Sequence, residues 1–169
     1  MKFVPMGERA VWHSRAMEAA GGHTGLHSRI ELYVELKEID LLAKSVRGAS
    51  GPALEAVSHY GTEPAAARLE KSHPGAAARL WRAQGMRIVS AKKSRYNEAA
   101  VSNFKRAKRC YEKAALEAEW LETVQTVRAA HFRKIGFMTE FEVVVSGAAP
   151  ERQPSFLERA KAKWRGAKG

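Results

Sequence analysis

Cysteine and long apolar runs are nearly absent from this chain of 169 residues. Cys110 is the only cysteine, so no disulfide and no Cys-based zinc site can form within the chain. No stretch approaches the roughly 18 consecutive apolar residues that a membrane helix needs. The N-terminal segment lacks the apolar centre of a secretory signal. We therefore expect a protein without a transmembrane segment, and a reducing compartment would suit it.

Sequence motifs with a strong catalytic mechanism are also missing. Neither GxxxxGK[ST] nor GxGxxG occurs, so nothing suggests a loop that cradles nucleotide phosphates. Ser90–Lys93 matches SxxK without the companion motifs of that enzyme class. His23, His27 and Glu31 would share one face of a helix, but we place both histidines in a loop before it. The sequence predicts no catalytic site, no metal site and no cofactor.

Acidic residues are too few to balance the basic ones. Lys and Arg number 29 against 18 Asp and Glu, which gives a net charge of +11 and a pI near 10.0. Between residues 79 and 113, eleven basic residues face only Glu98 and Glu112. Such a stretch favours a polyanionic partner, because contact with phosphates releases bound counterions. The predicted contact residues here are Arg79, Arg82, Arg87, Lys92, Lys93, Arg95, Lys105, Arg106, Lys108, Arg109 and Lys113.

A second basic stretch lies near the C-terminus, where the predicted contact residues are Lys161, Lys163 and Arg165. No RNP1 box, GXXG loop or zinc finger occurs, so RNA would be recognised by shape and backbone. Three aromatic residues lie among these Lys and Arg residues and could stack on an unpaired nucleobase: Trp81, Tyr96 and Trp164. Packing in a core or an interface is the alternative for each of these rings.

The fold predicted is mostly α-helical, with a long helix or helical hairpin at its core. The span 86–134 contains neither Gly nor Pro, and its apolar residues recur at helical spacing. We expect one helix-dominated span here, with a break near Ser94–Asn97. Its apolar stripes are Phe104, Ala107, Tyr111, Ala114, Ala118 and Leu121, and Leu116, Trp120, Val124, Val127 and His131. We expect Gly136 to end the span.

Three domains are expected: an irregular segment over 1–27, a helical domain over 28–145, and a linker with a basic C-terminal helix over 146–169. Ser28 and Glu31 have capping-box spacing, which predicts a helix from Ser28 to the stop at Gly48. Between 50 and 85, Pro52 and Pro64 follow the potential caps Ser50 and Thr62 and precede Ala-rich stretches. We expect short Ala-rich helices that pack through small side chains.

Residues 137–145 alternate in hydropathy, as FMTEFEVVV. This alternation predicts one isolated β-strand, which would pair with another chain because no partner edge is evident. The alternative interpretation is an apolar extended segment that lies over the helices.

Two non-catalytic functions fit these features. The first is a structural subunit of a large, ribosome-like ribonucleoprotein that contacts rRNA backbone through a basic helix and neighbouring subunits through its termini. The second is an accessory subunit of a mitochondrial respiratory complex or ATP synthase. We expect an intracellular location, with the mitochondrion as the suspected compartment. Arg9 and Arg15 are typical of an organellar presequence, whereas Glu8 and Glu18 argue against one.

Overall fold

The protein is all-α in the part of the chain that the computed structural model describes, which comprises residues 15, 25–91 and 93–148. The predicted helical class is confirmed, and no strand occurs among these residues. No helix in the described ranges has both the length and the apolar character needed to cross a bilayer. The elements are α2 (Leu26–Leu36), α3 (Ile39–Gly48), α4 (Gly51–Ala56), α5 (His59–Leu69), α6 (Pro74–Ser90), the 3-10 helix η1 (Ser94–Tyr96), α7 (Asn97–Lys113), α8 (Glu117–His131) and α9 (Ile135–Ser146).

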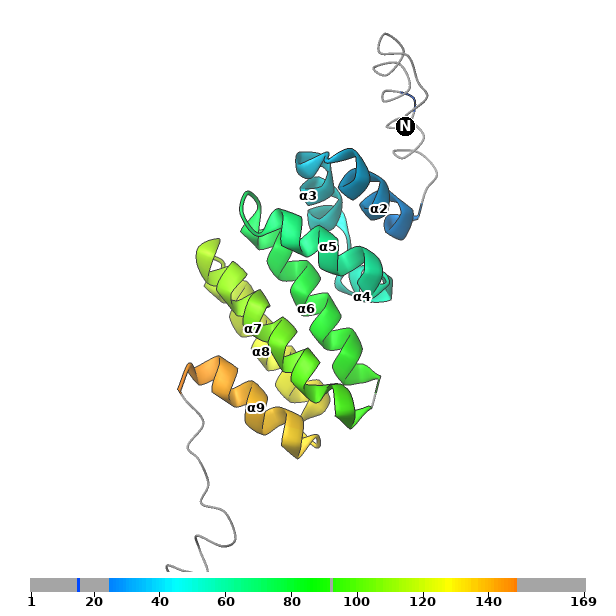
Figure 1. Ribbon diagram of the computed structural model, residues 1–169. Helices are drawn as coiled ribbons and strands as arrows, with labels where there is room; N and C mark the ends of the chain where they lie inside the picture. Colours follow the sequence, from blue (N-terminus) through cyan, green and yellow to red (C-terminus); the bar gives the residue numbers. More distant parts are fainter. Residues whose placement is uncertain (1–14, 16–24, 92, 149–169) are drawn as a thin grey trace, which may run out of the picture.

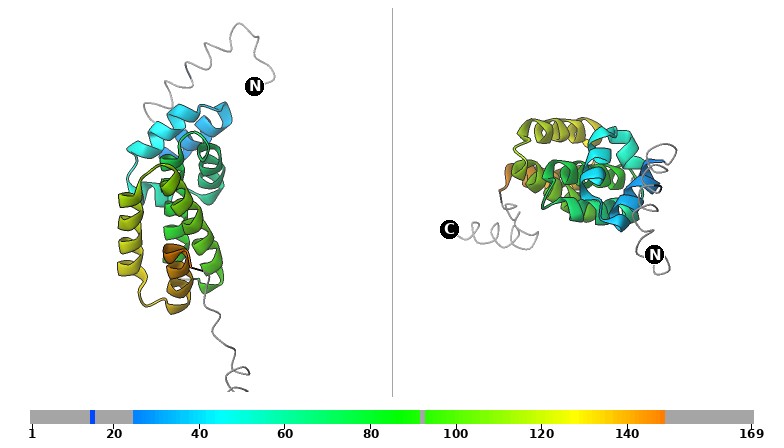
Figure 2. Two further views of the ribbon diagram at one scale, coloured as in Figure 1. Left: turned by 90° about the vertical axis from the view of Figure 1, so that its left-hand side faces the viewer. Right: turned by 90° about the horizontal axis from the view of Figure 1, so that it is seen from above.

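Helix α6 is the centre of the molecule, because it packs against α3, α4, α5, α7 and α8. Figure 1 shows α2–α5 gathered at one end and α7–α9 at the other, with α6 extending into both groups. Helices α6 and α7 run antiparallel and make the most extensive contact. Figure 2 shows α8 upright alongside this pair, and α9 packs against α7 and α8.

A glycine in α6, Gly85, allows α6 and α7 to approach each other closely. A Cβ atom on Gly85 would lie 2.9 Å from Cε2 of Phe104, which is completely buried. The Phe104 ring meets Phe141 edge-on, with centroids 5.1 Å apart, and Phe137 stacks on Phe141 at 5.6 Å. Such aromatic pairs add to the free energy of burial. This aromatic cluster joins α7 to α9.

The predicted helix Ser28–Gly48 and the predicted span 86–134 are each interrupted. Helix α2 begins at Leu26, and its N-cap residue is Gly25, which has no side chain to cap it. Ser28 lies inside the helix, so the predicted capping box with Glu31 does not form. Lys37 then adopts the left-handed conformation (φ 60°) and ends α2. Ala115 (φ 55°) makes the same kind of turn between α7 and α8. The break expected near Ser94–Asn97 is confirmed by η1.

The apolar stripe that crosses this turn was predicted in part correctly. Phe104, Ala107 and Tyr111 are buried, whereas Leu121 is 58 % exposed. Because Ala115 redirects the chain, residues on the two sides of the turn cannot share one helical face. The second stripe ends with Trp120, Val124, Val127 and His131, all buried.

Small side chains pack α5 against α6, as predicted, through the buried residues Ala65, Ala66, Ala76, Ala77 and Ala78. The Ser50 hydroxyl caps α4 by accepting a hydrogen bond from the Ala53 amide. Thr62 is not a cap, because α5 begins three residues earlier and contains Pro64. The Thr62 hydroxyl is buried and donates to Gln84 Oε1 at 2.9 Å instead.

The isolated strand predicted over 137–145 is wrong, and so is the extended alternative, because α9 occupies this segment. Phe137 and Phe141 are four residues apart and are both completely buried, which is helical spacing. Gly136 does not end the preceding helix, since α8 stops at His131 and Gly136 lies in α9. A segment of nine mostly apolar residues fits the spacing of a helix as well as that of a strand. The valines favour a strand because they are β-branched, but packing against α7 outweighs this preference and favours the helix.

Candidate nucleic-acid interface

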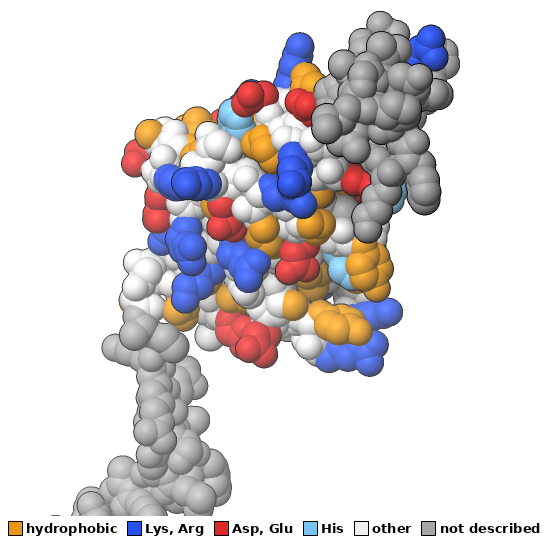
Figure 3. All heavy atoms as spheres, turned by 45° about the horizontal axis from the view of Figure 1, so that its top comes forward, with side chains coloured by type: hydrophobic (Ala, Val, Ile, Leu, Met, Phe, Trp, Pro, Cys, Tyr) orange, Lys and Arg blue, Asp and Glu red, His pale blue; other side chains and the backbone are white. Residues whose placement is uncertain are grey.

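The basic residues predicted to bind a polyanion lie on α6, η1, α7 and the loop between α6 and η1. Figure 3 shows Lys and Arg side chains close together on part of one face, with acidic side chains between them. Lys92 and the C-terminal residues Lys161, Lys163 and Arg165 lie outside the described residues. The structure separates the remaining ten into residues that hold the fold together and residues that face solvent.

Four of the ten bind the C-terminal ends of other helices. Arg79 donates to the carbonyls of Arg47 and Ala49 at the end of α3, and Arg87 donates to the Val57 carbonyl after α4 at 3.2 Å. Helix C-termini carry unpaired carbonyls and a partial negative charge, so a cation stabilises them. Lys134, which was not predicted, donates to the Val89 carbonyl near the end of α6. We call these residues the capping cations: Arg79, Arg87, Lys108, Lys113 and Lys134.

Lys113 and Lys108 are the capping cations on α7. Lys113 Nζ donates to the Glu70 carbonyl at 2.9 Å, just after the end of α5. Lys108 Nζ donates to the carbonyls of Val144 and Val145 at 2.9 and 3.1 Å, at the end of α9. It also lies 3.8 Å from the Glu112 carboxylate. Their ammonium groups therefore have partners within the fold.

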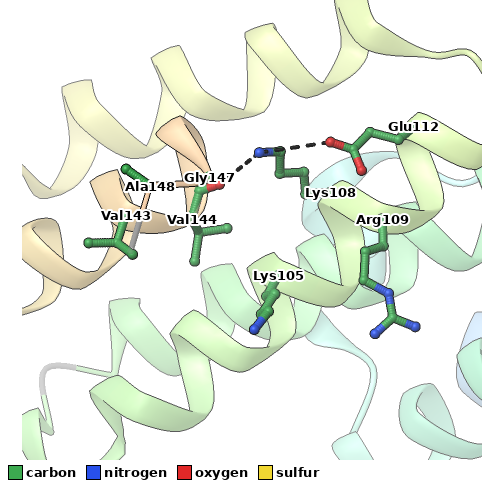
Figure 4. A pocket seen from close by; sticks show the side chains of 8 residues that line it. All are labelled: Lys105, Lys108, Arg109, Glu112, Val143, Val144, Gly147 and Ala148. Atoms are coloured by element: carbon green, nitrogen blue, oxygen red, sulfur yellow. Dashed lines mark hydrogen bonds and ion pairs between the residues drawn. The ribbon is translucent and has the colours of Figure 1, made fainter. Parts of the chain in front are cut away.

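Figure 4 shows where Lys108 sits. The dashed lines from its ammonium run to the end of α9 and to Glu112. Lys105 and Arg109 extend from the same helix, and neither makes an ion pair or hydrogen bond with the described residues. A hollow of about 450 Å³ lies here, lined by Lys105, Lys108, Arg109, Glu112, Val143, Val144, Gly147 and Ala148.

Two more of the basic residues contact other parts of the fold, Arg82 and Arg106. Cys110, near Arg106 in the sequence, is buried. Arg82 Nη1 lies 3.7 Å from the Glu55 carboxylate, and burial raises the pKa of Glu55 although Arg82 opposes this shift. Arg106 lies over the ring of Trp81, 4.6 Å from its centroid. Trp81 is only 1 % exposed, so it is a core residue. This is the alternative to base stacking that the sequence analysis gave. Burial raises the pKa of the Cys110 thiol and outweighs the cations beside it.

The cations that face solvent form a second set, which we call the outward cations. The Lys93 side chain is exposed and makes no hydrogen bond or ion pair with the described residues. Arg95 stacks on Tyr96 with 4.7 Å between the guanidinium carbon and the ring centroid. Tyr96 is itself 43 % exposed. The outward cations are Lys93, Arg95, Lys105, Arg106 and Arg109, all of them exposed, although Arg106 also covers the Trp81 ring.

A groove beside Tyr96 combines several of these residues with others that the sequence analysis did not identify. We call it the Tyr96 groove. It is a hollow of about 390 Å³ between the start of α5, the end of α6, and the η1–α7 junction. The sequence pointed to Arg87, Lys93 and Tyr96, whereas His59 lies outside the basic stretch and Gln84, although inside it, is uncharged. The groove is lined by His59, Gln84, Arg87, Ile88, Ala91, Lys93, Tyr96 and Ala99.

The histidine pair considered for metal binding does not form a site in the described residues. His27 lies inside α2, not before it, and its Nε2 is 3.3 Å from Glu31 Oε1. His23 lies outside the described residues. Within the described ranges, no three His, Cys, Asp or Glu side chains are grouped to hold a metal ion.

Known proteins give no further guide to the site. Comparison of the chain with protein families, curated proteins and solved structures finds no match.

Proposed function

We propose that this chain is a non-catalytic structural subunit of a large, ribosome-like ribonucleoprotein and that it contacts RNA backbone through the outward cations. One observation carries the proposal. After five cations have been used to cap helices and Arg82 has paired with Glu55, basic side chains still face solvent along η1 and α7 without acidic partners. Surface cations without acidic partners are suited to phosphates.

The geometry of α7 supports a continuous contact. Lys105 and Arg109 are four residues apart and therefore lie on the same face of the helix. Two like charges at this spacing repel each other, so the fold gains nothing from their proximity. Only Glu112 is acidic among the residues lining the hollow beside them. An external polyanion would relieve this repulsion.

The alternative function, an accessory subunit of a mitochondrial respiratory complex or ATP synthase, is favoured by a different surface. Phe132 is 63 % exposed and Ile135 is 78 % exposed at the turn between α8 and α9. Exposed apolar side chains of this size favour contact with a neighbouring protein. Both functions place the chain in an assembly, but only the first requires RNA at the outward cations.

The test compares two double variants on α7 that remove the same charge. Lys105→Gln with Arg109→Gln removes two outward cations, and Lys108→Gln with Lys113→Gln removes two capping cations. We expect the first variant to bind single-stranded RNA more weakly and to flatten the slope of log affinity against log salt by about 1.4, since each lost phosphate contact contributes about 0.7. Gln is nearly as good a helix former as Lys or Arg, so helicity should not change.

The second variant is the matched control. It should lower the free energy of unfolding yet keep the salt slope of the wild type when measured where both are folded. Filter binding over a range of salt concentrations measures affinity and slope. Equal slopes for the wild type and the outward variant would remove these residues from the interface. Absence of any RNA binding by the wild type would leave the accessory-subunit function as the better proposal.

A further inference from the structure

The Tyr96 groove has flat rings on walls that come from different parts of the chain. Tyr96 belongs to η1, and His59 is the first residue of α5. Between them the lining is apolar, with Ile88, Ala91 and Ala99. The volume of about 390 Å³ falls at the small end of the roughly 300–1,000 Å³ typical of ligand sites. A small, largely apolar hollow that has two flat rings in its lining suits a planar ring.

A buried amide also lines the groove. Gln84 is 8 % exposed, and its Oε1 accepts a hydrogen bond of 2.9 Å from the Thr62 hydroxyl. Thr62 is itself 2 % exposed, and its single hydroxyl proton goes to Gln84 Oε1, the nearer of its two acceptors, rather than to the Ser58 carbonyl at 3.2 Å. The bond with Thr62 orients the amide plane of Gln84. Its Nε2 makes no hydrogen bond with the described residues, so the amide nitrogen remains available as a donor to a ligand.

Positive charge surrounds the same hollow. Arg87 and Lys93 line it, and the guanidinium of Arg87 uses one nitrogen for the Val57 carbonyl. Ala99, at its edge, is seven residues before Arg106, which is two turns of α7 and about 10 Å along the helix axis. The two therefore lie on the same side of α7. A chain of phosphates that leaves the groove along this side of α7 would pass Arg106.

We propose that the Tyr96 groove binds one unpaired nucleotide. Its base stacks on Tyr96, the free amide nitrogen of Gln84 donates to an acceptor on the base edge, and Lys93 and Arg87 contact the adjacent phosphate. Stacking on aromatic side chains tolerates every base, whereas a single amide adds only a modest preference. As a site on RNA this proposal rests on the proposed function; the same chemistry would also accept a free nucleoside monophosphate.

The experiment uses the full chain and three probes: a fluorescein-labelled single-stranded RNA hexamer, a labelled RNA duplex, and adenosine monophosphate measured by calorimetry. We expect Tyr96→Ala to weaken hexamer binding by between about five-fold and about a hundred-fold, with duplex binding unchanged. Tyr96→Phe should retain hexamer binding. Gln84→Met should weaken it by about two- to ten-fold, the range of one neutral hydrogen bond.

Phe132→Ala is the matched control, because Phe132 is an exposed aromatic residue that does not line the groove. Circular dichroism verifies that each variant is folded. Equal hexamer affinity for Tyr96→Ala and the wild type would overturn the groove proposal, as would an equal loss with Phe132→Ala. If the wild type binds hexamer and duplex alike, the groove proposal fails while RNA binding stands. If only adenosine monophosphate binds, and Tyr96→Ala abolishes it, the nucleotide site stands and the ribonucleoprotein function fails.

Discussion

Replacing Lys108 by Met tests whether the basic residues of α7 serve the fold. Lys108 has a side chain that is 20 % exposed, and its ammonium bonds two carbonyls at the end of α9, those of Val144 and Val145. Met has a similar length and helix propensity, so the substitution removes the cation while largely preserving the packing of the stem. The carbonyls of α9 would then lose their charged donor.

The expected cost follows from these bonds. Hydrogen bonds to a charged group contribute roughly 1.5–3 kcal/mol each, but carbonyls near the surface recover part of this from water. The ion pair with Glu112, which is 54 % exposed, adds little, because surface pairs contribute about 0–1 kcal/mol. We therefore expect Lys108→Met to lower the free energy of unfolding by about 1–3 kcal/mol. For a domain of this size the melting temperature should fall by roughly 2–12 °C.

Urea unfolding followed by circular dichroism measures this change. The slope of the free energy of unfolding against urea concentration should equal that of the wild type. Lys105→Met is the control, because it makes the same substitution on the same helix at a side chain that bonds none of the described residues. It should change the free energy of unfolding by less than about 0.5 kcal/mol. Equal midpoints for the two variants would refute the distinction between capping and outward cations.

Two further predictions concern the core and the dependence of stability on pH. Gly85→Ala should lower the free energy of unfolding by about 1–3 kcal/mol in urea unfolding, because the new methyl would meet the Phe104 ring at 2.9 Å; Gly136→Ala, with nothing within 4 Å, should be neutral or slightly stabilising, and the reverse order would contradict the close contact. Burial, with a contribution from Lys134, lowers the pKa of His131, whose Nε2 is buried and without a partner among the described residues. The unfolded chain thus binds a proton below about pH 6.5 that the folded chain excludes, so stability should fall as pH drops below this value. His131→Leu should flatten this decline in urea titrations at successive pH values, and an unchanged decline would show that another group causes it.

The helical class could be predicted because most apolar residues recur at helical spacing, but several boundaries could not. Lys37 and Ala115 adopt the left-handed turn that normally favours Gly, so neither left a stop signal in the sequence. The start of the predicted span at residue 86 was also wrong, because α6 runs from Pro74 to Ser90 and contains Gly85. Its role is close packing against Phe104, which depends on a residue elsewhere in the chain.

The candidate site was predictable only in part for a related reason. Charge clustering locates cations along the chain but does not say what each one touches. Arg79 and Lys113 were grouped with Lys105, although the first two bind carbonyls 30 or more residues away in sequence. Gln84 is uncharged although it lies between Arg82 and Arg87 in the sequence, and only the fold brings it into a groove with Tyr96.

The capping cations also affect how the molecule opens. Each one binds carbonyls between 30 and 45 positions distant in the sequence. A helix end normally frays independently of the remainder of its domain. Here, opening the end of α5 or α9 requires releasing a side chain of α7, so fraying is coupled to the centre of the bundle. Slow, collective amide exchange at these ends is the expected signature, and peptides containing α5 or α9 alone would lack it.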